Sequence, residues 1–121
     1  MKANRRRMRV LVVDDDPMVL KATTRQLQRR HFDVVSAGGV SEARTVLETQ
    51  KIDAVVTDRD MPEGGGAVVC QIAVEHNVPS VVYTGNPNGL PSRPWVLLKP
   101  ATEQESTAAV WWVLHDQGKV F

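Results

Sequence analysis

Reactive side chains follow four short apolar runs of this chain. The runs are residues 10–13, 54–57, 80–83 and 95–98, and the side chains after them are Asp14, Asp15 and Asp16, then Asp58 and Asp60, then Thr84 with Gly85, and finally Lys99. Continuous Val and Leu runs are typical of strands buried on both faces, as in a parallel sheet. Ligands of open parallel sheets bind at the carboxyl ends of the strands. We therefore expect carboxylates, a hydroxyl and an ammonium group to meet at one edge.

These residue types together predict phosphoryl transfer. Two like charges about 4 Å apart repel by about 4 kcal/mol at an effective dielectric constant of 20, so clustered carboxylates must hold a proton or a cation. An all-oxygen site favours Mg²⁺, which keeps waters and shares phosphate oxygens. A carboxylate can act as a nucleophile, and the Lys99 ammonium would stabilise a transferred phosphoryl group. The Thr84 hydroxyl and a backbone N–H at Gly85 could donate to its oxygens.

Strand and helix patterns alternate along the chain, which predicts an α/β fold with a doubly wound, five-stranded parallel sheet. Asp16 followed by a proline is typical of a helix N-terminus, and Thr102 with Glu105 forms a capping-box pattern. The expected strands are residues 9–13, 32–36, 53–57, 79–83 and 95–98, and the expected helices are residues 17–30, 41–49, 67–76 and 103–117.

The connection between the last two strands differs from the others. Residues 85–94 contain three prolines, two glycines and two asparagines, a composition that does not sustain an ordinary helix. Parallel strands are usually joined by a crossover that includes a helix. We therefore predict that the fourth helix of the alternating pattern, between these two strands, is shortened or missing.

Composition narrows the class of protein. A chain of 121 residues predicts a single domain, which we expect over residues 9–118, after a basic N-terminal arm at residues 1–8. The formal net charge of +1 favours neither direct nucleic-acid binding nor membrane-surface binding. No apolar stretch approaches the roughly 18 to 20 residues that span a bilayer. With one cysteine in the chain, a cytoplasmic protein is expected.

The reactive residues resemble a known family, the receiver domain of two-component response regulators. The resemblance is carried by Asp14-Asp15 after the first strand, Asp58-Arg59-Asp60-Met61-Pro62 after the third, Thr84-Gly85 after the fourth and Lys99-Pro100 after the fifth. It covers essentially the whole chain and implies a flavodoxin-like strand order 2-1-3-4-5. The Thr-Gly pair and the altered fourth helix are similar to a subgroup of the family in which that helix is reduced.

The resemblance also implies roles. Asp58 would accept a phosphoryl group from a histidine kinase or phosphotransfer protein, and Lys99 would pair with Asp58 and then with that group. Asp15 would bind Mg²⁺ directly with help from Asp14, and Asp58 and the backbone carbonyl of Asp60 would complete the protein ligands; Mn²⁺ can substitute. Thr84 would swing toward the phosphoryl group, and Gly85 would contact it. The Lys99–Pro100 peptide is expected to be cis.

Family membership further implies a signalling domain that acts on an unknown downstream protein. It would be at most weakly enzymatic, through self-phosphorylation and autodephosphorylation. One departure from the family and one further feature of the sequence bear on signalling. Val96 stands where the family often carries an aromatic switch residue.

Trp111 and Trp112 are adjacent, so on a helix they point about 100° apart. We expect one of them in the core and the other at a partner surface, where a homodimer could form through the last helix.

Two other functions remain open at this point. Asp58-Arg59-Asp60 after a strand also resembles the D-x-D pattern of haloacid-dehalogenase-like phosphatases, which use an aspartate nucleophile, although Pro62 departs from that pattern. The chain could instead be a phosphorylation-independent interaction module with a receiver-like shape. The complete set of acids, hydroxyl and lysine argues against the latter.

Overall fold

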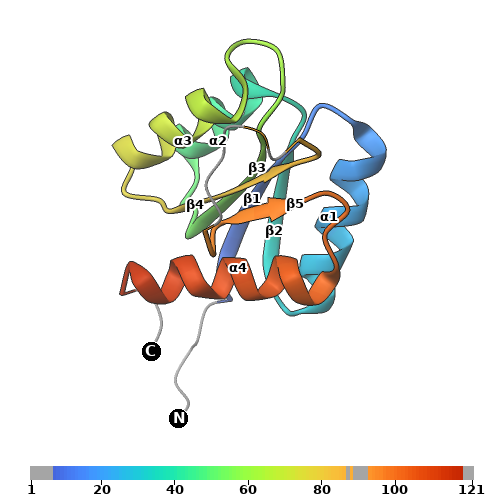
Figure 1. Ribbon diagram of the computed structural model, residues 1–121. Coiled ribbons are helices and arrows are strands. Elements are labelled where there is room, and N and C mark those ends of the chain that lie inside the picture. Colours follow the sequence, from blue (N-terminus) through green and yellow to red (C-terminus); the bar gives the residue numbers. More distant parts are fainter. Residues whose placement is uncertain (1–6, 87, 89–92, 119–121) are drawn as a thin grey trace.

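The computed structural model describes residues 7–86, 88 and 93–118. Five parallel strands form one sheet in the order β2-β1-β3-β4-β5, as the sequence predicts (Figure 1). The strands are β1 (Arg9–Val13), β2 (Asp33–Ala37), β3 (Ala54–Asp58), β4 (Ser80–Thr84) and β5 (Val96–Leu98). The helices are α1 (Pro17–Arg29), α2 (Val40–Thr49), α3 (Gly65–Glu75) and α4 (Glu103–Asp116). Most of the basic arm predicted at residues 1–8 lies outside the described residues.

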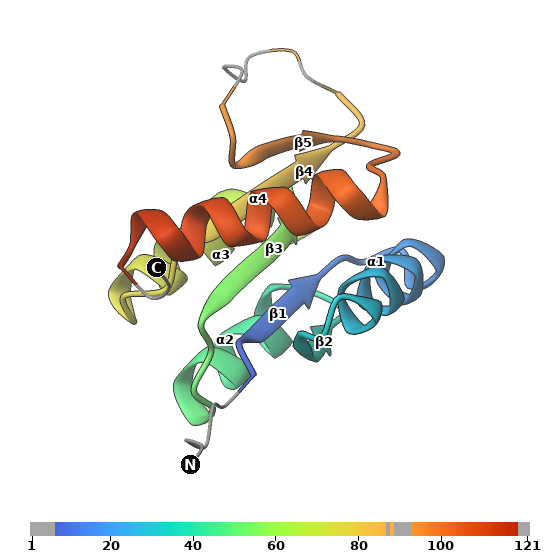
Figure 2. The ribbon, with the colours of Figure 1, turned by 90° about the horizontal axis from the view of Figure 1, so that it is seen from below.

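The sheet separates two helical layers. In Figure 2, α4 lies in front of the strands and α3 behind them. Helices α1 and α4 contact one another on one face, and α2 and α3 do so on the other. Successive side chains of a strand point to opposite faces, so each strand supplies both layers. In β1, Val10 and Val12 pack toward α1 and α4 while Leu11 and Val13 pack toward α2 and α3.

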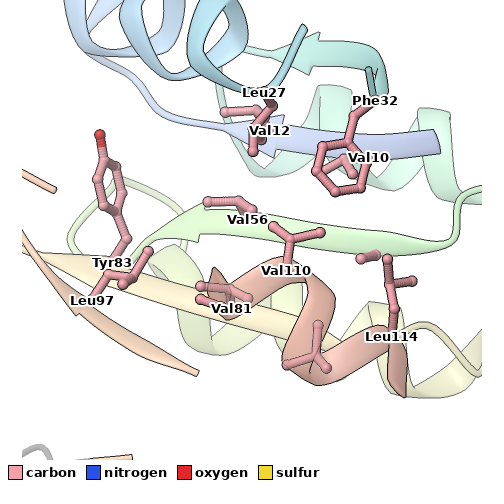
Figure 3. Close-up of a cluster of buried hydrophobic side chains, with 13 residues drawn as sticks. Val10, Val12, Leu27, Phe32, Val56, Val81, Tyr83, Leu97, Val110 and Leu114 are labelled. Atoms are coloured by element: carbon pink, nitrogen blue, oxygen red, sulfur yellow. The ribbon is translucent and has the colours of Figure 1, made fainter. Parts of the chain in front are cut away.

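The layer under α1 and α4 forms the larger of the two hydrophobic clusters in the described chain. Figure 3 shows Val10, Val12 and Val56 of the central strands facing Leu27 of α1 and Val110 of α4. Burial of such side chains contributes about 1.5–3 kcal/mol each. This packing fixes where the carboxyl ends of the strands lie relative to α1 and α4.

The predicted helix starts are present. The Asp16 carboxylate accepts hydrogen bonds from the N–H groups of Met18 at 3.0 Å and Val19 at 3.4 Å. Thr102 and Glu105 form the reciprocal capping box, with distances of 2.8 and 3.0 Å. Each cap satisfies N–H groups that the first helical turn leaves without partners. The caps begin α1 and α4 next to the ends of β1 and β5.

Helix α3 begins earlier than the sequence predicts. It starts at Gly65, two residues before the expected Ala67. A Cβ at Gly65 would lie 2.4 Å from the Arg59 carbonyl oxygen, and a Cβ at Gly66 would lie 2.6 Å from that of Asp58. The glycines therefore belong to the first turn of the helix, because only they allow it to approach the end of β3 so closely.

The chain passes from β4 to β5 without a helix among the described residues of the connection, which are 85, 86, 88 and 93–95. This agrees with the predicted shortening or loss of a helix there. The remaining residues of that connection lie outside the described part. The next helix, α4, is the one predicted after Thr102.

The expectation that one of the two adjacent tryptophans is a core residue is wrong. Trp111 and Trp112 are 41% and 39% exposed. The Trp111 ring packs on Phe32 with centroids 4.9 Å apart, and the Trp112 ring packs on Trp95 at 5.3 Å. The core stripe of α4 is filled by smaller side chains such as Val110 and Leu114, so both indoles cover its flanks. No helix within the described ranges is long and apolar enough to cross a membrane.

Candidate functional site

Strand periodicity brings three site residues to the same end of the same sheet face. Each lies two positions beyond a residue of the cluster under α1 and α4: Asp14 beyond Val12, Asp58 beyond Val56, and Lys99 beyond Leu97. Side chains two positions apart on a strand point to the same face. The parallel register places the strand ends beside one another, so these side chains converge.

The Lys99 ammonium bridges two buried carboxylates. Its Nζ atom lies 3.0 Å from Asp58 Oδ1 and 3.3 Å from Asp14 Oδ2. The Asp14 and Asp58 residues are only 1% and 5% exposed, whereas the Lys99 side chain is 23% exposed. Charge-assisted hydrogen bonds of this kind are stronger than neutral ones. Asp14 is further held by the Asp16 N–H, which donates to Asp14 Oδ1 at 2.9 Å.

Burial and the neighbouring charges shift the pKa values of Asp14 and Lys99. Loss of water around Asp14 raises the pKa of its carboxyl, and the Asp58 charge adds to this; the bonds from the Asp16 N–H and Lys99 oppose the shift without cancelling it. Burial alone would lower the pKa of Lys99, but its hydrogen bond to Asp58 and the two carboxylate charges raise it overall. Lys99 is therefore a cation at neutral pH.

Asp15 completes a group of three acids. Oxygen atoms of Asp14, Asp15 and Asp58 all lie within 4.8 Å of one another. An octahedral Mg²⁺ ion holds its oxygens at about 2.1 Å, so opposite ligands are about 4.2 Å apart. Three carboxylates and one ammonium leave two uncompensated negative charges, which a divalent ion would neutralise. The donor set therefore fits Mg²⁺, and the oxygens need to approach one another only slightly to match its spacing.

Thr84 stands at the same rim but on the opposite sheet face. It is fully buried, and its Oγ1 lies 3.1 Å from the Asn86 carbonyl oxygen and 3.3 Å from Asp60 Oδ2. The Asn86 N–H donates back to Thr84 Oγ1 at 3.0 Å. Asp60 itself is exposed, and within the described residues no atom other than those of its chain neighbours lies within 4 Å of a Cβ built on Gly85. The Thr84 hydroxyl thus bonds to the backbone of the loop after β4, and Gly85 leaves open space beside this loop.

The cis peptide expected between Lys99 and Pro100 is present.

The site also contains two residues that the sequence analysis did not identify. Arg59, directly after Asp58, donates from Nη1 to the carbonyl oxygens of Asn86 at 3.1 Å and Asn88 at 3.0 Å. It ties the loop after β4 to the loop after β3. No signal in the sequence pairs an arginine with carbonyls 27 and 29 residues away.

The second missed residue is Tyr83, on the strand position opposite Asp58. Its ring centroid is 4.8 Å from Lys99 Nζ, and its hydroxyl is 2.7 Å from Thr23 Oγ1. Burial raises the pKa of the Tyr83 phenol, so it keeps its proton. A signal was available, because a tyrosine within a buried apolar run requires a partner for its hydroxyl.

Comparison with known proteins supplies an independent finding. Residues 10–89 match the family model of the response regulator receiver domain. The match includes the three acids of the site and Thr84, and it ends before Lys99.

Two curated relatives are longer than this chain. The chain is 31% identical over 75 residues to the heme response regulator HssR of Staphylococcus saprophyticus, covering 61% of this chain and 34% of the relative. It is 34% identical over 91 residues to the CAI-1 autoinducer sensor kinase/phosphatase CqsS of Vibrio cholerae, covering 71% of this chain and 13% of the relative. The chain therefore spans about a third or less of these proteins.

Solved structures agree over nearly the full length. A response regulator receiver protein from Sinorhizobium medicae matches with a TM-score of 0.79 and 26% identity, covering 92% of this chain and 97% of that one. A CheY-like receiver domain protein from Methanospirillum hungatei matches with a TM-score of 0.79 at 19% identity, covering 94% and 98%.

Proposed function

Because the chain belongs to the response regulator receiver domain family, a family of signalling domains, we propose that Asp58 accepts a phosphoryl group from the phosphohistidine of a histidine kinase or phosphotransfer protein. The observation that carries this proposal is the Lys99 ammonium, held 3.0 Å from Asp58 and 3.3 Å from Asp14. This cation is in reach of the acceptor oxygen and of any phosphoryl group attached to it.

The transfer needs only its two partners and one proton from solvent. An oxygen of the Asp58 carboxylate forms a bond to phosphorus, the N–P bond of the phosphohistidine breaks, and its electron pair returns to the imidazole, which takes up a proton. The product is an acyl phosphate on Asp58. Attack of water on phosphorus would later release inorganic phosphate and restore the carboxylate. Lys99 stabilises negative charge on the phosphoryl oxygens both when Asp58 is phosphorylated and when the acyl phosphate is hydrolysed.

Asp14, Asp15 and Asp58 would hold Mg²⁺, with the backbone carbonyl of Asp60 as a further ligand and Mn²⁺ as a substitute. When bound, the ion supplies positive charge against the phosphoryl oxygens. The support for this assignment is the fit of three close carboxylate oxygens to a divalent ion. Without the ion, the charge of the three acids exceeds that of Lys99.

Thr84 would turn its hydroxyl toward the phosphoryl group and give up its bond to Asn86, while the Gly85 N–H would donate to a phosphoryl oxygen. Support comes from the two competing acceptors that Thr84 Oγ1 already has, Asn86 O and Asp60 Oδ2, since one hydroxyl proton serves only one of them. Exchange of partners at Thr84 would then alter the loop that Arg59 holds, and a downstream protein in the cytoplasm would sense that change. A homodimer through α4 remains a prediction.

The test is Mg²⁺-dependent modification by acetyl phosphate, followed by intact-mass spectrometry. The wild type should gain one phosphoryl group per chain, and the Asp58→Asn variant none. Asp116→Asn, a change at an exposed acid of α4, is the matched control and should behave as the wild type. An unmodified wild type that is folded and supplied with Mg²⁺ would reject phosphoacceptance and favour a phosphorylation-independent module. Steady turnover of a small phosphate ester would favour the aspartate-nucleophile phosphatase.

A further inference from the structure

A buried tyrosine that the proposed chemistry does not use lies beside the Lys99 ammonium. Tyr83 is 6% exposed and belongs to the core cluster under α1 and α4. Figure 3 shows its ring at one end of that cluster, with the hydroxyl directed away from Leu97. The residue lies opposite Asp58 in the sheet register. Tyr83 therefore lies where the core meets the site, beside the Lys99 ammonium.

The ring face is the first contact. Lys99 Nζ lies 4.8 Å from the ring centroid, within the range of a cation–π interaction. The ammonium thus has two carboxylates and one aromatic face around it. Lysine is a flexible four-carbon chain, and a cavity of about 270 Å³ opens beside Lys99, lined in part by Met18, Thr23 and Pro100. The Tyr83 ring also lines this cavity, so the favoured position of the ammonium is the one in which it contacts the ring and both carboxylates at once.

The hydroxyl is the second contact. It lies 2.7 Å from Thr23 Oγ1 in α1, and Thr23 is 3% exposed. A short hydrogen bond between two buried groups fixes the position of the hydroxyl and with it the direction of the ring axis, because the alternative leaves both hydroxyls without partners. A leucine or methionine at position 83 would fill much of this space but could form neither contact.

From these contacts we infer that Tyr83 is a positioning residue, whose ring face, anchored to α1 by the hydroxyl bond to Thr23, holds the Lys99 ammonium against Asp58 and Asp14. The inference rests on the proposed phosphorylation of Asp58 for its functional consequence. Loss of the ring should slow phosphorylation of Asp58 by about 2- to 30-fold, the kinetic equivalent of a cation–π interaction. Loss of the hydroxyl alone should have a smaller effect, because the ring face remains.

The experiment compares phosphorylation rates with acetyl phosphate at saturating Mg²⁺. Tyr83→Leu and Tyr83→Met remove the ring, Tyr83→Phe removes only the hydroxyl, and Thr23→Val removes its partner. Phenylalanine carrying several fluorine atoms at position 83 keeps the ring volume and weakens the charge of its face, so it tests the cation–π contact in a core that remains filled. Val81→Ala is the matched control, since Val81 is a fully buried member of the same strand and cluster.

The expected order of rates is wild type, then Tyr83→Phe and Thr23→Val with similar modest losses, then the fluorinated ring, then Tyr83→Leu and Tyr83→Met. Combining Tyr83→Phe with Thr23→Val should cost no more than either alone, because both remove one bond. Val81→Ala should lower stability while the folded protein is modified at the wild-type rate, and Mg²⁺ affinity should stay constant throughout. A fluorinated ring or a folded ring-less variant that reacts at the wild-type rate would overturn the inference.

A second readout separates this inference from the proposed function. In proton NMR spectra of the unmodified protein, the Lys99 Hε resonances should be shifted by the Tyr83 ring current. The shift should persist in Tyr83→Phe and vanish in Tyr83→Met. If the wild type is never phosphorylated but these shifts behave as stated, the proposed function fails and the positioning contact stands. If the shifts are absent from the wild type, the contact is refuted whatever the fate of Asp58.

Discussion

Gly66 approaches the backbone of Asp58 so closely that a Cβ atom there would lie 2.6 Å from the Asp58 carbonyl oxygen. The same glycine donates its N–H to the Arg59 carbonyl at 2.9 Å. The start of α3 is therefore packed directly on the backbone that carries the proposed phosphoacceptor. Neither backbone can move without disturbing a strand or a helix, so the glycine sets where Asp58 lies.

Gly66→Ala should destabilise the protein by about 1–3 kcal/mol, the usual effect of overpacking, despite the better helix propensity of alanine. Because the displaced atoms belong to Asp58, the phosphorylation rate should fall as well. Urea denaturation and acetyl phosphate labelling measure the two effects. Gly39→Ser is the control, since in the described part of the chain no atom beyond its neighbouring residues lies within 4 Å of a Cβ at Gly39. A Gly66→Ala variant as stable as the wild type would show that the approach is looser than described.

Lys99→Met should lower the free energy of unfolding without Mg²⁺ by about 1–3 kcal/mol, because it leaves two buried carboxylates without their cation. Removal of one partner from a fully buried pair costs about 3–5 kcal/mol, and the effect is smaller here since the Lys99 side chain is 23% exposed. Saturating Mg²⁺ should recover most of the loss by supplying the missing positive charge. Denaturation with and without the metal measures this.

The matched control for that variant is Lys21→Met, at an exposed position of α1. It should change neither the stability nor the response to Mg²⁺. Equal stability of Lys99→Met and wild type in the absence of metal would contradict the bridging role of the ammonium.

Glu103 gives stability a defined pH dependence. Its carboxylate bonds to the Arg30 and Arg29 guanidinium groups, both at 2.7 Å, and these bonds hold its pKa below the ordinary value of 4.5. A lowered pKa in the folded state means that the contribution is present above pH 4.5 and is lost as the pH falls through the lowered value. This pair of contacts joins α1 to α4.

Glu103→Gln should therefore be less stable than the wild type at neutral pH and equal to it at the acid end, with the difference closing below pH 4.5. Urea denaturation over a pH series measures it. Glu48→Gln, at an exposed position of α2, should show no such closing difference. A stability difference for Glu103→Gln that is independent of pH would refute the charge-based account.

The strand ends, and with them Asp14, Asp58 and Lys99, could be predicted from the sequence. Buried parallel strands appear in the sequence as continuous apolar runs, and the residues that follow such runs lie at the same edge of the sheet. The contacts of Tyr83 and Arg59 could not be predicted in this way. These depend on how α1 packs over the sheet and on how two loops meet, which no local pattern encodes.

The positions of the two tryptophans also depend on packing that the local sequence does not determine. Helical geometry shows that Trp111 and Trp112 cannot share a face, but it does not say where the core stripe lies. In the structure that stripe is occupied by Val110, Val113 and Leu114, so both indoles lie on the flanks. The early start of α3 was missed because glycines usually argue against a helix, whereas here the close approach to Asp58 requires them.

The most direct test of the account is to identify the modified residue itself. After treatment with acetyl phosphate and Mg²⁺, reduction with borohydride converts an aspartyl phosphate into homoserine, which peptide mass spectrometry locates. We expect homoserine at position 58 alone, in an amount that depends on Mg²⁺. Modification at Asp14, Asp15 or a histidine, with position 58 still aspartate, would contradict it.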